Sequence, residues 1–466
     1  MAWFHGKSVT LQRENQWKSV MLKRRIEDRI REHLTSDSRT IMIVDGARQV
    51  GKSFIIRNLG KELFPNFVEI NMYDDKKGNK VFEGTGSVQD FYFRLSTFAG
   101  PKLKKKNNTL VFIDEIQAYP ELLTMLKFLK DDDRYTYIVS GSQLGIALNE
   151  TLSKPGGRIE VVRMFPLDFE EFLWANGVGA EAIGQLQGAF ESHRSLDEPM
   201  HRVFLDLFKK YLLVGGLPDA VNRFVASNNI VEVRRVHDAI QQLYREDAAQ
   251  YDAENKLKIR RIYDLIPSNL ENKKKRVQFN EIEGKRGKTF ATYADEFEYL
   301  IQAGVAIEVK SISNPRFPLV ESTMKNLMKL YLNDVGLLTN ILYRYNIRAV
   351  LDDERSINLG SVYESVVASE LLAHGYHLYY YDNKGKGEVD FLIDDYDRLT
   401  AVPVEVKSGK DYARHKALDK FIGNPDYHIK RAVVLSNERE FRTEGIKEYV
   451  PVYFVMFFRP STPMMM

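Results

Sequence analysis

The stretch that decides the fold of the first part of the chain is Gly46-Ala47-Arg48-Gln49-Val50-Gly51-Lys52-Ser53, which directly follows the apolar run Thr40–Asp45. It matches the pattern G-x-x-x-x-G-K-[ST], in which glycines allow successive backbone N–H groups to turn toward an anion. A helix predicted over Phe54–Leu63 would direct its positive dipole end at the same anion. Strand, loop and helix in this order predict a phosphate-binding loop formed by all eight residues. Lys52 would contact the β- and γ-phosphates of a nucleotide, and the hydroxyl of Ser53 would coordinate Mg²⁺.

An acidic pair at the end of a second apolar strand agrees with this prediction. Leu110–Ile113 runs into Asp114 and Glu115. A carboxylate beside the loop can hold Mg²⁺ through water, and its neighbour can activate the attacking water. Strands often end in acids, so the pair gains weight only from its place downstream of the loop. We therefore assign Asp114 to the metal and Glu115 to catalysis.

Two further positions are candidates for completing the nucleotide site. Ser140 ends the predicted strand Tyr135–Ser140 and can sense the γ-phosphate, while Ser142 and an ordinary turn remain alternatives. Arg158 can act as a catalytic arginine finger supplied to a neighbouring subunit, which would require a homo-oligomer. A surface arginine is the other interpretation of that residue.

A second set of charged residues lies near the C-terminus. Asp390 falls on a predicted strand, and Glu405 and Lys407 share one face of the next strand because they are two residues apart. A hairpin can bring the three together, and Glu364 on the helix predicted over Leu359–His374 can complete a metal site. Carboxylates and a lysine in this arrangement can bind Mg²⁺ and stabilise a hydroxide that attacks a phosphodiester. Solvent-facing charges on a strand pair, or a nuclease fold kept only for binding, are the alternatives.

Several motifs together resemble a known family. They are, in chain order, Arg48-Gln49, Asp114-Glu115-Ile116-Gln117, Ser140-Gly141-Ser142, Gly157-Arg158, residues 165–172 (FPLDFEEF), residues 211–218 (YLLVGGLP) and residues 329–337 (KLYLNDVGL). This set resembles the bacterial and archaeal AAA-type ATPases that carry a C-terminal domain of unknown function. The resemblance implies an enzyme that binds and hydrolyses ATP with Mg²⁺. Ala47 stands where the family usually has proline. The C-terminal set resembles the PD-(D/E)xK restriction-endonuclease-like core, with Val389 in place of the leading proline.

The chain divides into three predicted parts. Residues 1–175 alternate short apolar strands and helices, which predicts an α/β P-loop NTPase domain with a parallel sheet and helices on both faces. Residues 176–345 read as a helical and winged-helix region, because two strand-like runs, Val305–Ser311 and Met328–Leu332, follow several helices. Residues 346–466 read as an α/β restriction-endonuclease-like domain, ending in a predicted strand over Val452–Phe457 and a loose tail.

Composition excludes some classes of protein. Hydrophobic residues make up 44% and charged residues 28%, which fits a globular chain rather than a collagen-like or disordered one. Without cysteine there are no disulfides and no zinc–thiolate sites. The longest apolar runs are too short to cross a bilayer, and the N-terminus has no apolar signal-peptide core, so we expect no membrane partner and a cytoplasmic location.

Charge gives only a local indication of a partner. The 67 Lys and Arg residues exceed the 64 acidic residues by three, too small an excess to indicate nucleic acid. Residues 254–288, however, hold eleven basic and five acidic residues, which fits either a solvated linker or a phosphate-binding surface.

The function predicted from these patterns is Mg²⁺-dependent ATP binding and hydrolysis, coupled to a C-terminal nuclease-like module that acts on DNA. The alternative is a nucleotide-controlled switch or DNA-binding regulator with no cleavage activity, and a protein-partner scaffold is a third reading. His374 and His377 are expected to be core or surface residues rather than metal ligands, and residues 379–381 (YYY) are expected to pack.

Overall fold

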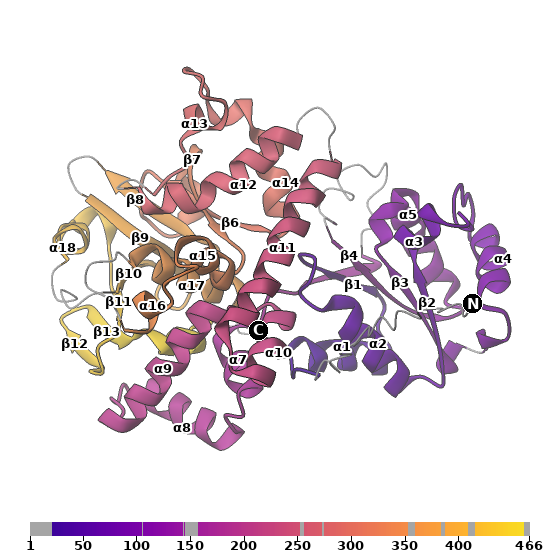
Figure 1. The fold of residues 1–466 in the computed structure, drawn as a ribbon, viewed down its shortest axis with the longest axis horizontal. Coiled ribbons are helices and arrows are strands. Elements are labelled where there is room, and N and C mark those ends of the chain that lie inside the picture. The colour runs from indigo at the N-terminus through magenta and orange to yellow at the C-terminus, as the bar shows by residue number, and fades with distance from the viewer. Residues whose placement is uncertain are drawn as a thin grey trace, which may run out of the picture.

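The computed structural model describes residues 21–104, 106–142, 144, 157–251, 256–272, 275–352, 359–383, 387–408 and 415–460. Figure 1 shows two lobes. The N-terminal lobe is built around its own sheet, and the larger lobe contains the middle and C-terminal parts of the chain. The loose tail predicted from residue 461 onward lies outside the described residues.

A parallel five-stranded sheet with the order β2-β3-β4-β1-β5 forms the N-terminal lobe. Its strands are β1 (Ile41–Asp45), β2 (Asn66–Asn71), β3 (Thr109–Asp114), β4 (Thr136–Gly141) and β5 (Ile159–Arg163). The central strands β1, β3 and β4 are largely buried because helices cover both faces of the sheet. The predicted P-loop NTPase fold of this part is confirmed.

Helices cover the two faces of this sheet separately. They are α1 (Ile26–Thr35), α2 (Lys52–Leu63), α3 (Met72–Lys77), α4 (Val88–Ala99) and α5 (Pro120–Asp132). Met42 and Val44 pack with α1 and α2, whereas Ile41 and Ile43 point to the other face and pack with α4 and α5. The alternation of side chains along β1 produces this division.

The carboxyl ends of the parallel strands meet at one edge, and the register places polar residues there side by side. Asn71 at the end of β2 is level with Asp114 at the end of β3. Ser140 on β4 is level with Val44, next to Asp45, where β1 enters the phosphate-binding loop. This edge is where an open α/β sheet usually binds its ligand.

Helices dominate the middle of the chain, as the sequence predicts. They are α7 (Phe169–Ala175), α8 (Ala180–Glu191), α9 (Glu198–Val214), α10 (Pro218–Ser227), α11 (Ile230–Tyr251), α12 (Lys256–Glu271), α13 (Phe279–Glu283) and α14 (Ala294–Gln302). The basic segment is therefore largely α12, α13 and their connections rather than a linker, although its residues 254, 255, 273 and 274 lie outside the described part. Figure 1 shows α11 running between the two lobes.

The larger lobe contains a mixed eight-stranded sheet with the order β12-β13-β11-β10-β9-β8-β6-β7. Its strands are β6 (Ala306–Ile312), β7 (Thr323–Leu332), β8 (Tyr379–Asn383), β9 (Gly387–Asp395), β10 (Thr400–Lys407), β11 (Ala432–Ser436), β12 (Arg442–Glu444) and β13 (Lys447–Pro451). The helices that accompany it are α15 (Val335–Leu342), α16 (Arg348–Leu351), α17 (Gly360–Ala373) and α18 (Lys416–Ile422).

The ribbon expected to be the wing of a winged helix joins this sheet. Strands β6 and β7 pair antiparallel with each other, and β6 also pairs with β8. Pairing satisfies the backbone groups that an exposed edge of β8 would leave open. One sheet thus runs across the predicted boundary at residue 345; the three-part division and the winged helix stay predictions.

The prediction of a strand over Val452–Phe457 is wrong. These residues form a 3₁₀-helix, η7, and Val452 to Met456 are all buried. A short continuous apolar run does not distinguish a buried strand from a buried helix. The strands missed nearby, β12 and β13, contain charged residues that hid them.

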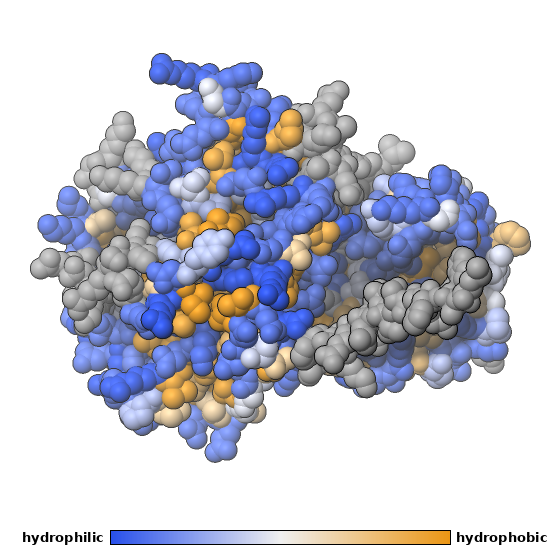
Figure 2. Space-filling view, in the orientation of Figure 1, coloured by the Kyte–Doolittle hydropathy of each residue, from blue (hydrophilic) through white to orange (hydrophobic). Residues whose placement is uncertain are grey.

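No helix in the described ranges combines the length and the apolar composition needed to span a bilayer. Figure 2 shows a largely hydrophilic surface on the face in view, with scattered apolar areas on the larger lobe. Residues 379–381 are buried, so they pack, as expected from the sequence.

Candidate nucleotide-binding site

The loop between β1 and α2 has the backbone that the sequence predicts. Gly46 and Gly51 have φ angles of 153° and 97°, and Gln49 also has a positive φ of 67°. A side chain at position 46 would collide with the carbonyl oxygen of Met164, which follows β5. Glycine is therefore required there both for conformation and for space.

The ammonium group of Lys52 is folded into this loop. Its Nζ donates to the carbonyl oxygens of Gly46 at 2.8 Å and Ala47 at 2.9 Å. Burial lowers the pKa of Lys52, an effect opposed by the negative charges of Glu115 and Asp45. The cation is thus held inside the cradle, by neutral carbonyl groups that a phosphate could replace.

Asp114 accepts hydrogen bonds from neutral donors on three elements. The hydroxyl of Ser53 lies 2.9 and 3.0 Å from its two oxygens, the amide of Asn71 lies 3.1 Å away, and Ser140 donates a short hydrogen bond. Burial raises the pKa of Asp114, and the hydroxyl of Ser140 opposes this rise. A hydroxyl and a carboxylate side by side are oxygen ligands of the kind that Mg²⁺ takes.

Glu115 is held away from Asp114 by a different pair of side chains. Its φ of 54° is left-handed, a strained conformation common at functional sites. Gln117 donates a short hydrogen bond to Glu115, and the hydroxyl of Ser142 donates to the same oxygen at 3.0 Å. Of the two serines considered from the sequence, Ser140 contacts Asp114, the carboxylate predicted to hold the metal, and Ser142 contacts Glu115, the predicted base. A role of either serine in sensing the γ-phosphate stays a prediction.

A cavity of about 480 Å³ opens over the loop. Besides the loop it is lined by residues that the sequence analysis did not single out, among them Leu22, Asn71, Tyr73, Asn222 and Leu243. Asn71 could have been found, because a polar residue ending β2 must lie beside the end of β3. The other residues carry no local signal of a nucleotide site in the sequence.

Helix α11 reaches the same loop. The guanidinium of Arg48 forms an ion pair with Asp247 and lies over the ring of Tyr73 at 5.6 Å, and Tyr244 donates to the carbonyl oxygen of Arg48 at 3.0 Å. Burial raises the pKa of Asp247 to about 6. The side chain of Arg48 is thus tied to the middle region, outside the cradle of backbone amides.

Comparison with known families agrees with this geometry. Residues 38–173 match a family described as an AAA domain. We refer to the N-terminal lobe, which combines this match with the P-loop fold, as the AAA domain. Residues 205–346 and 359–455 match two families that are each described as a domain of unknown function (DUF8612 and DUF4143). No curated protein matches the sequence.

Three of the solved structures similar to the chain share little sequence identity with it. The Walker-type ATPase PABY2304 of Pyrococcus abyssi is 16% identical, with a TM-score of 0.44 over 68% of this chain and 95% of that one. The Aeropyrum pernix ORC1 protein in complex with DNA is 14% identical, with a TM-score of 0.31 over 72% and 95%. The S. cerevisiae Hsp104–ADP complex is 13% identical, with a TM-score of 0.29 over 61% and 38%. These TM-scores all lie below 0.5.

Arg158 lies at the edge of the AAA sheet opposite the phosphate-binding loop. Its carbonyl oxygen accepts from Ile41, the first residue of β1, whereas the loop follows Asp45 at the other end of that strand. Its guanidinium forms an ion pair with Asp131 at 2.8 Å, and both side chains are about half exposed. Arg158 therefore cannot reach the nucleotide site of its own chain, and an action on a neighbouring subunit stays a prediction.

The C-terminal residues predicted to act together do lie together. Lys407 donates to Glu405 at 2.6 Å, and Asp390 accepts from the backbone N–H of Val406 at 2.9 Å. The pKa of Glu405 is raised to about 8, mainly by burial and next by the negative charge of Asp390. Glu364, on α17, is close enough to add to this rise, and two lysines that the sequence analysis did not assign, Lys275 and Lys329, also belong to the cluster.

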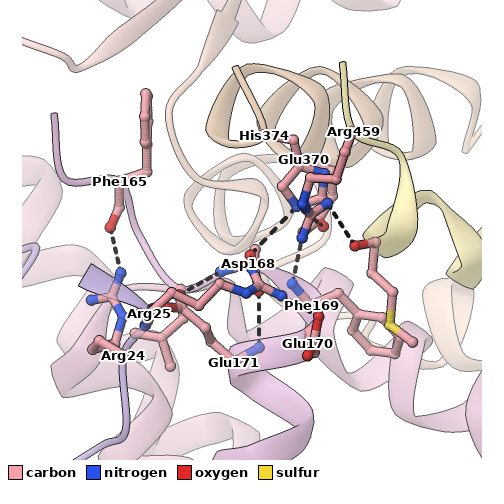
Figure 3. Close-up of polar contacts among 12 residues, drawn as sticks. Arg24, Arg25, Phe165, Asp168, Phe169, Glu170, Glu171, Glu370, His374 and Arg459 are labelled. Carbon is pink, nitrogen blue, oxygen red and sulfur yellow. Dashed lines mark hydrogen bonds and ion pairs between the residues drawn. The ribbon is translucent and has the colours of Figure 1, made fainter. Parts of the chain in front are cut away.

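A buried polar network joins the AAA domain to α17 (Figure 3). Arg24 donates to the carbonyl oxygen of Val50 in the phosphate-binding loop at 3.2 Å and to Glu171 at 3.0 Å. Glu370 on α17 accepts from the backbone N–H of Phe169 at 2.7 Å, and His374 lies 3.4 Å from Asp168. The same region includes Arg25, which pairs with Asp168 and Glu170, and Arg459.

In this network, the pKa values of Glu370 on α17 and of His374 directly after it are both shifted toward the uncharged form. Burial raises the pKa of Glu370 to about 7. Burial and the charges of Arg459 and Arg25 lower the pKa of His374 to about 2. The side chain of His374 is therefore neutral and buried, and His377 is exposed, which are the core and surface positions expected from the sequence.

Proposed function

We propose that this protein binds ATP with Mg²⁺ at the phosphate-binding loop and hydrolyses it. The observation that carries the proposal is that Lys52, Ser53 and Glu115 line one cavity and that the hydroxyl of Ser53 donates to Asp114. The neutral partners of Lys52 and Glu115 are groups that a nucleotide and its attacking water can replace. A cavity of about 480 Å³ is within the size range of small-molecule sites.

Each residue would have a separate task. Lys52 would exchange its two carbonyl partners for the β- and γ-phosphates. Ser53 and Asp114 would hold Mg²⁺, which supplies positive charge against the negative charge that develops in the transition state. Glu115 would leave Gln117 and Ser142, orient the attacking water and accept its proton.

ATP turnover by Glu115→Gln tests this assignment. The amide keeps the size of the side chain but accepts no proton, so we expect ATP binding to remain and turnover to fall at least about 100-fold. Glu121→Gln, an exposed change in the first turn of α5, is the matched control and should hydrolyse ATP normally. Normal turnover by Glu115→Gln would refute the assigned base.

The observation that favours a second function, a nucleotide-controlled switch or DNA-binding regulator without cleavage, is the network of Figure 3. It connects Val50, in the loop that would hold the phosphates, to α17, the helix that bears Glu364. A nucleotide that shifts the loop would thereby shift Arg24, Glu171 and the end of α17. The C-terminal module would then contact its target differently in each nucleotide state.

DNA is the partner we propose for that module. The basic residues of the segment 254–288 give it limited support, because several form ion pairs within the chain. Lys258 pairs with Glu296, Arg260 with Asp264 and Lys288 with Glu283. Arg261, Arg276, Lys285 and Arg286 are the described cations of this segment for which DNA contacts are proposed.

One experiment tests both parts of the second function. Limited proteolysis and DNA gel-shift assays, with a cleavage assay alongside, would be run with an ATP analogue, with ADP and without nucleotide. We expect the digestion pattern and the DNA affinity to depend on nucleotide in the wild type and not in Lys52→Ala. Identical results in all three states would remove the switch, and cleavage of DNA would favour the nuclease.

A further inference from the structure

The carboxylates of the C-terminal cluster are not arranged to hold a metal ion in the way that the nuclease resemblance implies. Across the described residues, no group of three or more His, Asp and Glu side chains is arranged to hold one. One oxygen of Glu364 takes the ammonium of Lys275 in a short ion pair, and the other accepts from the hydroxyl of Tyr331 at 3.2 Å. Both oxygens of Glu364 therefore already have partners within the chain.

Lys275 is placed there by the fold rather than by a chance surface contact. It lies in the connection from α12 to α13, and both sides of that connection are anchored close by. Glu271, at the end of α12, accepts a short hydrogen bond from Ser361 at the start of α17, and Val277 donates to the carbonyl oxygen of Met328 on β7 at 3.1 Å. Burial opposes the charge of Lys275, but Glu364 and Asp390 more than compensate and raise its pKa.

The charges of the cluster are nearly balanced. Its four carboxyl groups belong to Glu364, Glu388, Asp390 and Glu405, and its three ammonium groups to Lys275, Lys329 and Lys407. The formal sum is −1, because four negative charges meet three positive ones. A divalent cation gains little from such a site, whereas loss of Lys275 would make it −2. One oxygen of Glu405 is buried without a hydrogen-bond partner among the described residues, so an acceptor for a cation is present.

We propose that the ammonium group of Lys275 takes the place of a divalent cation at Glu364, and that the cluster binds no divalent metal while Lys275 is seated. The site is a metal site closed by a residue of its own chain. This inference is independent of ATP hydrolysis, because neither the cluster nor its test includes a nucleotide.

Mn²⁺ titration of the full-length, nucleotide-free chain tests it, with free Mn²⁺ followed by electron paramagnetic resonance. All variants carry Asp114→Asn, which removes the metal carboxylate of the loop. We expect no binding by this parent. Lys275→Met should bind Mn²⁺ at least about tenfold more tightly, because one opposing charge at contact distance is gone. Adding Glu364→Gln should abolish that gain, and Lys288→Met, whose lysine pairs with Glu283 outside the cluster, should behave as the parent.

Two results would overturn the proposal: Mn²⁺ binding by the parent that Glu364→Gln removes, or a folded Lys275→Met variant that gains nothing. A second measurement decides the matter if that variant does not fold. Acylation of lysines in the wild type, read by mass spectrometry, should modify Lys275 at least about tenfold more slowly than Lys288, because its amine is held by a buried carboxylate. Glu364→Gln should remove this protection, and equal rates for the two lysines in the wild type would contradict the proposal.

Discussion

The two carboxylate sites of this chain contain similar acids but opposite kinds of partner. Asp114 in the AAA domain accepts from two hydroxyls and an amide, whereas Glu364 in the larger lobe takes an ammonium group. Neutral donors satisfy a carboxylate without cancelling its charge, so Asp114 can still attract a cation. An ammonium cancels the charge, so Glu364 cannot. The chemistry of a carboxylate site therefore depends on what its acids are bonded to, not only on which acids meet.

The largest expected effect comes from disrupting the nucleotide site, which we call the open site because neutral groups satisfy its carboxylate Asp114. Lys52→Ala removes the only side-chain cation in the described phosphate-binding loop that is seated in its cradle, so we expect ATP affinity to fall at least about 100-fold. Isothermal titration with Mg²⁺ and an ATP analogue measures it. Lys61→Ala, an exposed change in the last turn of α2, should bind as the wild type does. Unchanged affinity in Lys52→Ala would mean that the loop does not hold phosphates.

The next effect tests the connection between the two sites through α17. Because burial raises the pKa of Glu370 to about 7 from an ordinary value of 4.5, the folded state keeps a proton that the unfolded state loses. The contribution of Glu370 to stability is thus complete below pH 4.5 and is lost as the pH rises through 7. Relative to Glu370→Gln, the wild type should lose up to about 3 kcal/mol of unfolding free energy over this range.

Urea denaturation at several pH values measures this difference. His374 is present in both proteins, so its own titration largely cancels, and Glu181→Gln on the exposed side of α8 serves as the control. A difference between wild type and Glu370→Gln that does not change with pH would show that Glu370 is not protonated in the interior.

A smaller effect tests the C-terminal cluster around Glu364, which we call the closed site because ammonium groups pair with its carboxylates. Lys407→Met leaves the carboxyl of Glu405 without its ammonium partner. At pH 8.5, above the pKa of about 8 that burial and Asp390 give Glu405, we expect a loss of about 1–2 kcal/mol, since Lys407 is partly exposed. Adding Glu405→Gln should restore most of it in urea denaturation. If the second substitution does not restore stability, Lys407 does not act by balancing the charge of Glu405.

The smallest effect concerns Arg158. Its ion pair with Asp131 is half exposed, so Arg158→Ala should change stability by less than about 0.5 kcal/mol. Because Arg158 lies at the far edge of the sheet, turnover at low protein concentration, where chains are separate, should stay within about twofold of the wild type. ATPase assays over a series of protein concentrations check this. A large loss at the lowest concentration would place Arg158 at its own site, against the geometry.

The sequence predicts the open site well and the closed site poorly, for a physical reason. The phosphate-binding loop is contiguous, and its glycines, lysine and serine impose the backbone and the chemistry locally. Asp114 and Glu115 need only one more fact, that parallel strands end at a common edge. Lys275, by contrast, meets Glu364 across 89 residues of chain, and no pattern near either residue indicates the contact.

The same distinction applies to the fold. In the parallel sheet, β1 and β3 are short apolar runs followed by a helix, a pattern that can be recognised locally in the sequence. The joining of β6 and β7 to β8 depends on which edge is left unpaired after α15, α16 and α17 have packed. Single-sequence patterns carry no information on that choice, so the ribbon could be predicted as a pair but not as part of the larger sheet.

Anomalous scattering from crystals grown with an ATP analogue and Mn²⁺ would examine both sites in one measurement. We expect a manganese peak beside Ser53 and Asp114, with the analogue in the phosphate-binding loop, and no peak among Glu364, Asp390 and Glu405. An empty loop, or a peak in the C-terminal cluster with Lys275 in place, would contradict the distinction between an open and a closed carboxylate site.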